Sequence, residues 1–276
     1  MKNITIAVIA MGLTLSCCDE IKDPLKDEYG FIDLPETNKT VLIEEFTGTS
    51  CTFCPNGARK IQGYIDANPE NVVTVAMHAS GFAIPNPSTP YDFRSDDGEE
   101  LYTFMGSGGL PGGMFDRGGY PNDVFKNPAD WDGLLIARLA EPASFSLQSE
   151  LEIDTANKTF NLNTQVFGIQ SLTDSDPIHL VAYLVEDSIV APQLDNGVIV
   201  DDYVHNHVFR KSFTGVQGNM ISANGFEESQ RVTRNLNISV TDSTWNVWNT
   251  SKISAVVFVL NASTQEVYQA QHAGLH

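Results

Sequence analysis

Positive charge is scarce in this sequence. It holds 16 Lys and Arg residues against 35 Asp and Glu residues, so its formal net charge is −19 at pH 7. A chain this acidic is repelled by the phosphates of nucleic acids and by anionic lipid surfaces. We therefore exclude nucleic acid as a partner, and we interpret the acidic surface as a source of solubility.

Cysteine is equally scarce, with four residues in the chain. They form two close pairs, Cys17 with Cys18 and Cys51 with Cys54. No distant pair remains, which excludes a framework of long-range disulfides. Zinc needs further ligands, and the sequence offers neither a second Cys-x-x-Cys motif nor a nearby histidine pair. We predict no metal and no cofactor.

Apolar runs long enough to span a bilayer are missing as well. The longest run, from Ile4 to Leu15, follows Lys2 and is shorter than the ~20 residues that a spanning helix needs. A basic residue, a short apolar run and a small residue, Ser16, form the layout of an export signal. The sequence therefore predicts a protein that leaves the cytoplasm.

The end of this signal resembles the lipobox of bacterial lipoproteins, in which the cysteine after a small residue is acylated and becomes the mature N-terminus. Cys17 follows Ser16, whereas Cys18 has Leu15 three residues before it. Both are candidates for lipidation, and we prefer Cys17. We expect residues 1–17 to be the signal and residues 18–38, which are charged and interrupted by proline, to be a tether.

Residues 39–141 alternate between strand and helix patterns. Continuous apolar runs predict buried strands, and apolar residues at helical spacing predict helices. We expect strands at 41–47 and 71–77 and helices at 54–67, 96–105 and 128–139. Such alternation is typical of an α/β sheet.

The sequence pattern changes after Glu141-Pro142, in residues 142–276. Short alternating runs are separated by turn residues such as those of Asp195-Asn196-Gly197. This pattern predicts an antiparallel β-sandwich. We expect its strands at 145–153, 159–167, 179–186, 234–240 and 253–260.

The motif Cys51-Thr52-Phe53-Cys54 stands between the first strand and the first helix. A cysteine near a helix start lies close to unpaired N–H groups that favour its thiolate. The second cysteine, within one turn, can then attack a mixed disulfide. A Cys-x-x-Cys pair in this setting indicates a redox site, and a local disulfide that only stiffens the turn is the alternative.

Leu110-Pro111 resembles the cis-proline that thioredoxin-like domains place opposite their cysteine pair. That resemblance implies that Pro111 aligns an extended substrate beside the reactive sulfur. The motif departs from thioredoxin in two ways, because Ser50 replaces the tryptophan and Thr52-Phe53 replaces Gly-Pro. Whether the pair is a reductant, an oxidant or an inert disulfide therefore stays open.

Several segments taken in order resemble the outer-membrane-protein-28-like lipoproteins of the Bacteroidota. They are EFTG at 45–48, the Cys-x-x-Cys-Pro that follows, LPG at 110–112, HNHVFR at 205–210 and AVVFV at 255–259. The resemblance implies an outer-membrane lipoprotein, with an N-terminal thioredoxin-like domain, and a surface adhesin or receptor role. The protein would be attached to the membrane through its N-terminal lipid.

Two functional hypotheses follow. In the first, the protein exchanges disulfides with protein thiols, with Cys51 as the exposed nucleophile, Cys54 as the resolving thiol and Pro111 as the aligning residue. In the second, it is a surface binding or adhesion lipoprotein whose β-sandwich holds an extracellular ligand. The cysteine pair then only braces the fold.

The lipid anchor can be tested directly. Replacing both Cys17 and Cys18 with Ser should release the protein from membrane fractions or block its maturation, because these are the two cysteines at the end of the predicted signal. Metabolic labelling with a fatty acid measures the outcome, and the two single variants identify the modified residue. Label retained by the double variant would contradict the lipobox interpretation.

Overall fold

The computed structural model of the chain describes residues 38–173 and 176–275. The predicted signal, nearly all of the predicted tether and the lipidation candidates Cys17 and Cys18 lie outside these residues. Among the helices that the structure describes, none is long and apolar enough to cross a membrane. The described residues belong to one compact unit.

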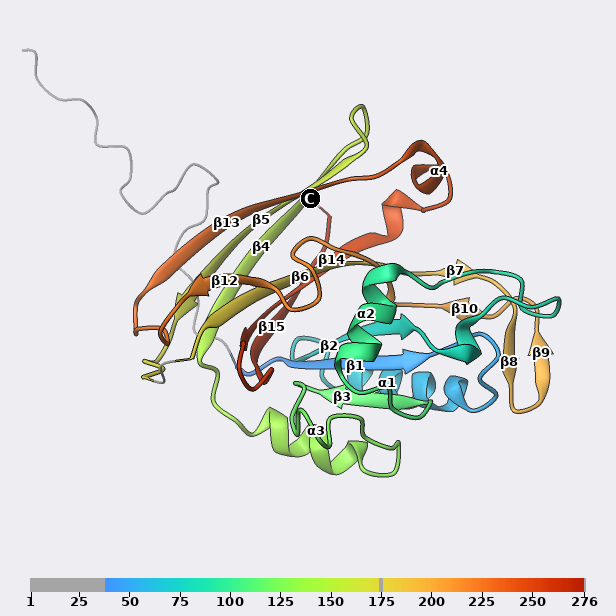
Figure 1. The fold of residues 1–276 in the computed structure, drawn as a ribbon, viewed down its shortest axis with the longest axis horizontal. Helices are drawn as coiled ribbons and strands as arrows, with labels where there is room; N and C mark the ends of the chain where they lie inside the picture. The colour runs from blue at the N-terminus through green and yellow to red at the C-terminus, as the bar shows by residue number, and fades with distance from the viewer. Residues whose placement is uncertain (1–37, 174–175, 276) are drawn as a thin grey trace, which may run out of the picture. The chain divides into compact units, whose positions relative to one another are not determined.

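The first part of the chain alternates strands and helices as expected (Figure 1). Strands β1 and β2 are parallel and buried along their whole length, and β3 runs antiparallel to β1. The elements are β1 (Val41–Thr47), α1 (Cys54–Ala67), β2 (Val72–His78), η1 (Gly81–Ala83), α2 (Asp96–Phe104), β3 (Gly112–Phe115) and α3 (Trp131–Leu139).

The regular elements in the rest of the chain are mostly strands, which confirms the prediction of a β-rich fold. The longer strands are β4 (Phe145–Asp154), β5 (Thr159–Gly168), β6 (Ile178–Glu186), β11 (Val208–Ser212), β12 (Asn219–Ser222), β13 (Arg231–Ser239), β14 (Ile253–Asn261) and β15 (Val267–Ala273). Shorter elements are β7 (Ile189–Val190), β8 (Gln193–Asp195), β9 (Val198–Val200), β10 (Val204–His205), α4 (Asp242–Trp245) and η2 (Thr250–Lys252).

One large sheet runs through both parts. Its order is β15-β14-β6-β11-β2-β1-β3, with β12 paired to β6. The predicted division between residues 141 and 142 falls in the connection from α3 to β4, but it is not a break in this sheet. Strand β11 pairs with β2 on one side and with β6 on the other, so it joins the strands of the two parts.

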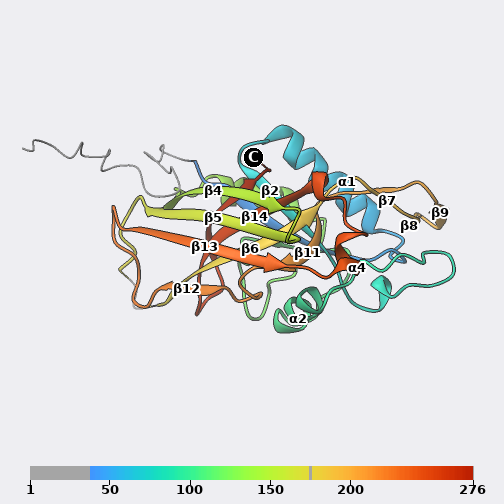
Figure 2. The same cartoon turned by 90° about the horizontal axis from the view of Figure 1, so that it is seen from above.

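The large sheet buries side chains on both faces. Alternate residues of β6, such as Val181 and Tyr183, pack into a core with Leu101 of α2. The residues between them, such as Ala182 and Leu184, face the other way, onto the three-stranded sheet β13-β5-β4. Figure 2 shows these three strands side by side over the large sheet. The two sheets thus form a β-sandwich at one end of a sheet that continues into β1–β3.

Two fully buried ion pairs join β1, β3 and the C-terminal strands. Both guanidinium nitrogens Nε and Nη2 of Arg117, just after β3, lie 2.8 Å from the carboxylate oxygens of Glu44 on β1. Arg117 also donates to the Tyr183 hydroxyl on β6 at 2.9 Å and to Gln265 Oε1 at 3.1 Å. Lys39 Nζ lies 3.1 Å from Asp116, and it donates to the carbonyl oxygens of Val267 and Tyr268 on β15.

Removing Arg117 should therefore be costly. Arg117→Ala leaves the Glu44 carboxylate buried without its partner, and such a loss destabilises a protein by about 3–5 kcal/mol. Arg94→Ala is the matched control, because the Arg94–Asp92 pair is partly exposed and should contribute less than ~1 kcal/mol. Urea denaturation measures both values. Equal losses in the two variants would contradict a central role for the buried pair.

Candidate functional site

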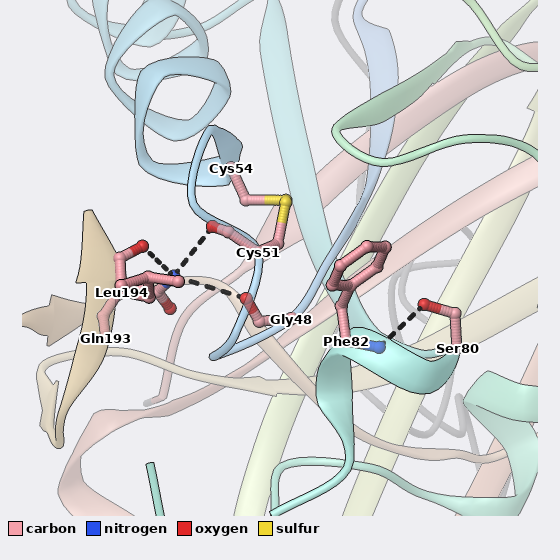
Figure 3. The surroundings of a disulfide bond; sticks show 7 residues. All are labelled: Gly48, Cys51, Cys54, Ser80, Phe82, Gln193 and Leu194. Carbon is pink, nitrogen blue, oxygen red and sulfur yellow. Dashed lines mark hydrogen bonds between the residues drawn. A yellow bond between two sulfur atoms is a disulfide. The ribbon is translucent and has the colours of Figure 1, made fainter. Parts of the chain in front are cut away.

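The cysteine pair lies in the connection between β1 and α1 (Figure 3). Cys51 and Cys54 are joined by a disulfide, and their Cα atoms are 5.4 Å apart. The backbone turns sharply here, since Cys51 N–H donates to the Gly48 carbonyl and Cys54 N–H donates to the Cys51 carbonyl. A Cβ atom at Gly48 would lie 2.5 Å from the Phe82 carbonyl, so only glycine allows this close approach.

Helix α1 begins at Cys54, with Pro55 in its first turn. Proline is suited to this position because its missing N–H would have no partner there. The first turn contains no acidic residue, so nothing within it opposes a thiolate near the positive end of the helix. The helix start can therefore stabilise a negative sulfur, as thiol chemistry requires.

Both cysteines are buried, at 4% exposed for Cys51 and 1% for Cys54. The prediction that Cys51 is an exposed sulfur is therefore wrong for this disulfide-bonded state. Two segments far from the motif in sequence lie beside it. Phe82 lies on one side of the disulfide, and Gln193 with Leu194 lies on the other (Figure 3).

Pro111 lies against helix α1, which begins at Cys54. The Leu110–Pro111 peptide bond is cis, and strand β3 begins at the next residue. A Cβ atom built at Gly57 would lie 3.2 Å from Pro111 Cβ, so the proline ring packs on α1 one turn after Cys54. Cys51, Cys54 and Pro111 thus all lie at or near the first turns of α1.

Glu45 is a member of this site that the sequence analysis missed. It lies on β1 and is 4% exposed, and its Oε1 atom has no hydrogen-bond partner among the described residues. The same atom lies 2.9 Å from the position of a Gly57 Cβ atom, directly under the start of α1. Burial raises the pKa of Glu45 from 4.5 to about 8, so its carboxyl group is poised to exchange a proton near neutral pH.

A cavity of about 320 Å³ lies beside these residues. Glu45, Cys54, His78 and Gln193 all contribute to its lining. Neither ring nitrogen of His78 has a hydrogen-bond partner within the described part of the chain. Burial, reinforced by the nearby His205 and Arg210, lowers the pKa of His78, so its ring is neutral. The cavity therefore holds one carboxyl group that titrates near neutral pH, Glu45, and one neutral imidazole, His78, with Cys54 in its lining.

The described residues contain no cluster of three or more His, Cys, Asp or Glu side chains placed to hold a metal ion. The arrangement around the cysteine pair has three parts. It combines a disulfide at a helix start, a cis-proline packed on that helix and a buried acid beneath it. Its groups can perform nucleophilic substitution at sulfur coupled to proton transfer.

Comparisons with known proteins identify relatives of the chain. The model of the family described as outer membrane protein Omp28 matches residues 98–276, which leaves the cysteine pair outside the match. The structure of HBP35 of Porphyromonas gingivalis has a TM-score of 0.63 and 18% identity, with 86% of this chain and 76% of that chain covered. At this identity the likeness shows the fold alone.

Two further solved structures are more distant. A domain of the outer membrane lipoprotein Omp28 from P. gingivalis is 19% identical, with a TM-score of 0.33 and coverage of 49% of this chain and 89% of that one. The protein AGR_C_4864 from Agrobacterium tumefaciens is 12% identical, with a TM-score of 0.49 and coverage of 88% and 97%. No curated protein matches the chain.

The burial of Glu45 makes a prediction about stability and pH. The carboxyl titrates near 4.5 when the chain is unfolded and near 8 when it is folded, so between these values the folded state holds a proton that the unfolded state has lost. Stability should therefore fall as pH rises through this window. Glu45→Gln removes this slope and should exceed the wild type in stability above pH 8 by roughly 2–4 kcal/mol.

Urea denaturation between pH 5 and 9 measures the difference. Glu100→Gln, an exposed substitution on α2, is the control and should keep the slope of the wild type. If Glu45→Gln also keeps that slope, the carboxyl group is not protonated in the folded protein.

Proposed function

The chain belongs to the Omp28 family of outer membrane proteins, and on that premise we propose that it is a lipid-anchored thiol-disulfide exchange protein of the outer membrane. Cys17 or Cys18 would carry the lipid. A thioredoxin-like domain built on β1, α1, β2, α2, β3 and α3 would carry the chemistry, with protein thiols as its partners.

The order and direction of these elements support the thioredoxin-like assignment. A parallel β1–α1–β2 unit carries the cysteine pair at the start of its helix, and the antiparallel strand β3 begins just after a cis-proline. The observation that carries the proposal is the meeting of three groups that are distant in sequence. They are the disulfide at the start of α1, Pro111 against that helix and Glu45 beneath it.

The exchange proceeds in two substitutions at sulfur. Cys51, as a thiolate, attacks a disulfide of the partner, forms a bond to one sulfur and releases the other as a thiolate. Cys54 then attacks Cys51 Sγ and displaces the remaining partner sulfur. The partner disulfide gains two electrons and two protons, while Cys51 and Cys54 become the disulfide. The reverse sequence oxidises a partner dithiol.

Glu45 fits the second substitution. Cys54 must lose a proton before it can attack, and the ordinary pKa of a thiol, about 8.5, is close to that of the buried carboxyl. Because both side chains line the same cavity, the proton can pass from Cys54 to the Glu45 carboxylate inside the protein. Matching of the two pKa values is what makes such a transfer efficient.

The burial of both cysteines favours the second candidate function, a surface binding or adhesion lipoprotein. In that case the disulfide would only fix the turn between β1 and α1, and the β-sandwich would hold the extracellular ligand. The two candidates differ in what the reduced protein does with an added disulfide.

The exchange proposal predicts a trapped intermediate. Reduced mature protein with Cys54→Ser should form a mixed disulfide through Cys51, because the resolving thiol is missing. Glu45→Gln should slow the closing of the wild-type disulfide about tenfold or more and flatten its dependence on pH between 7 and 9. Stopped-flow reaction with hydroxyethyl disulfide, followed by mass spectrometry, measures both effects.

Cys51→Ser is the control and should form no such complex. If the Cys54→Ser variant traps nothing and Cys51 reacts no faster than a free thiol at every pH, the binding function becomes the better account.

A further inference from the structure

The hairpin formed by β8 and β9 covers the cysteine pair from one side (Figure 3). Its turn is Asn196-Gly197, and both residues have positive φ values, 48° and 86°. Asn-Gly is the dipeptide best suited to a tight two-residue hairpin. The hairpin forms a two-stranded sheet of its own, so its position depends on what its sides contact.

Three backbone N–H groups of the hairpin bond to the segment that holds the cysteines. Leu194 N–H donates to the Thr49 carbonyl at 2.9 Å, and Asn196 N–H donates to the Thr52 carbonyl at 2.8 Å. Gly197 N–H donates to the Thr52 hydroxyl at 2.8 Å. The hairpin therefore follows the chain from just before Cys51 to just after it.

Gln193 adds a side-chain contact at the centre of this arrangement. It is 2% exposed, and its Nε2 atom lies 3.3 Å from the carbonyl oxygens of both Gly48 and Cys51. The same nitrogen lies 3.0 Å from the Leu194 carbonyl. The amide thus links the hairpin to both ends of the turn that ends in Cys51.

The outer end of the hairpin is tied to α1. Asp195 forms an ion pair with Arg59 at 2.8 Å, and Asn196 Oδ1 accepts from Asn56 at 3.1 Å. These contacts are more exposed than that of Gln193, so they add less to the docking of the hairpin. These contacts nevertheless hold the hairpin against helix α1, which begins at Cys54.

The opposite side of the disulfide is different in character. Phe53, Phe82 and Ile84 are 60%, 52% and 51% exposed. Phe53 lies between the two cysteines in the sequence, and Phe82 lies beside the disulfide (Figure 3). These exposed apolar side chains offer a surface for apolar side chains of a partner.

We infer that the β8–β9 hairpin is a lid that determines which partners reach the disulfide, with Gln193 as its positioning residue. The inference rests on the proposed exchange function. With the lid closed, the site accepts a narrow partner, namely an extended polypeptide with apolar side chains beside its cysteine. A folded protein with a shielded disulfide reacts only when the hairpin moves.

The lid is also coupled to the redox state of the pair. The carbonyl groups of Gly48, Cys51 and Thr52, which receive the hairpin, are held in place by the disulfide-closed turn. Reduction frees the turn and weakens that docking. By linkage, docking of the hairpin favours the disulfide by the same factor. Loss of Gln193 therefore shifts the pair toward the dithiol.

Gln193→Ala and Gln193→Glu test the inference, since the second keeps the shape of the side chain but removes its donors. In oxidised mature protein, reduction of the Cys51–Cys54 disulfide by a phosphine should be about 3–10-fold faster in both variants. The redox equilibrium with glutathione should shift toward the dithiol by a similar factor. The ratio of rates with insulin and with hydroxyethyl disulfide should rise about fivefold or more.

Asp195→Ala should weaken the docking of the same hairpin less than the Gln193 substitutions do. It breaks an exposed ion pair without a threat to folding and should produce smaller shifts in the same direction. Gln165→Ala is the matched control, a buried glutamine of the three-stranded sheet, and should leave every rate unchanged. Circular dichroism verifies that each variant is folded.

The lid inference would be overturned if the hairpin variants fold but are reduced by the phosphine at the rate of the wild type and have its redox equilibrium with glutathione. Failure of the exchange function has a different signature. In that case neither insulin nor hydroxyethyl disulfide reacts with the reduced wild type, while the rate of reduction by the phosphine still responds to Gln193.

Discussion

The Arg117–Glu44 ion pair is the contact on which the rest of this structure depends. Both side chains are fully buried, and a charge in such a place is tolerated only when its partner and its hydrogen bonds are complete. Completing them requires Tyr183 of β6 and Gln265 of the β14–β15 turn to reach the same guanidinium group. The pair thus fixes β1, the end of β3 and the C-terminal strands relative to one another.

This constraint reaches the cysteine pair through β1. Glu44 and its neighbour Glu45 point to opposite faces of the strand, as successive strand residues do. Arg117 pairs with the Glu44 carboxylate, whereas Oε1 of Glu45 lies under α1 without a hydrogen-bond partner among the described residues. The ion pair thus anchors the strand that leads into the turn carrying Cys51. The β8–β9 hairpin bonds to that turn.

Local sequence patterns were sufficient for much of the fold. The expected ranges of β1 and α1 match the structure, and the ranges expected for β4, β5, β6, β13 and β14 differ by a few residues at their ends. These predictions rested on residue propensity and on the spacing of apolar residues. Strands β7 to β12 were missed because each has only two to five residues, too few to establish a period. The last strand, β15, was missed as well, since its polar residues interrupt the apolar pattern.

Only part of the candidate site could be predicted from the sequence. Cys51, Cys54 and Pro111 belong to recognisable motifs, whereas Glu45 had only a weak signal, as a charged residue on the apolar side of a strand that begins Val41, Ile43. The hydrogen bond between Gln193 and Cys51 joins residues 142 positions apart. The sequence indicated a turn at Asn196-Gly197 but contained no local sign of where that hairpin would dock. The burial of Cys51 followed from that long-range contact.

The central claim is that one sheet and one buried ion pair make the α/β and β-sandwich parts a single cooperative unit. The tryptophans allow a direct measurement, because Trp131 packs under α1 while Trp245 and Trp248 are partly buried and pack against the β-sandwich core. One variant would keep only Trp131, and the other would replace it with Phe. In each, the urea transitions seen by fluorescence and by far-ultraviolet circular dichroism should coincide. A Trp131 transition at a different urea concentration from the circular dichroism transition would contradict the account.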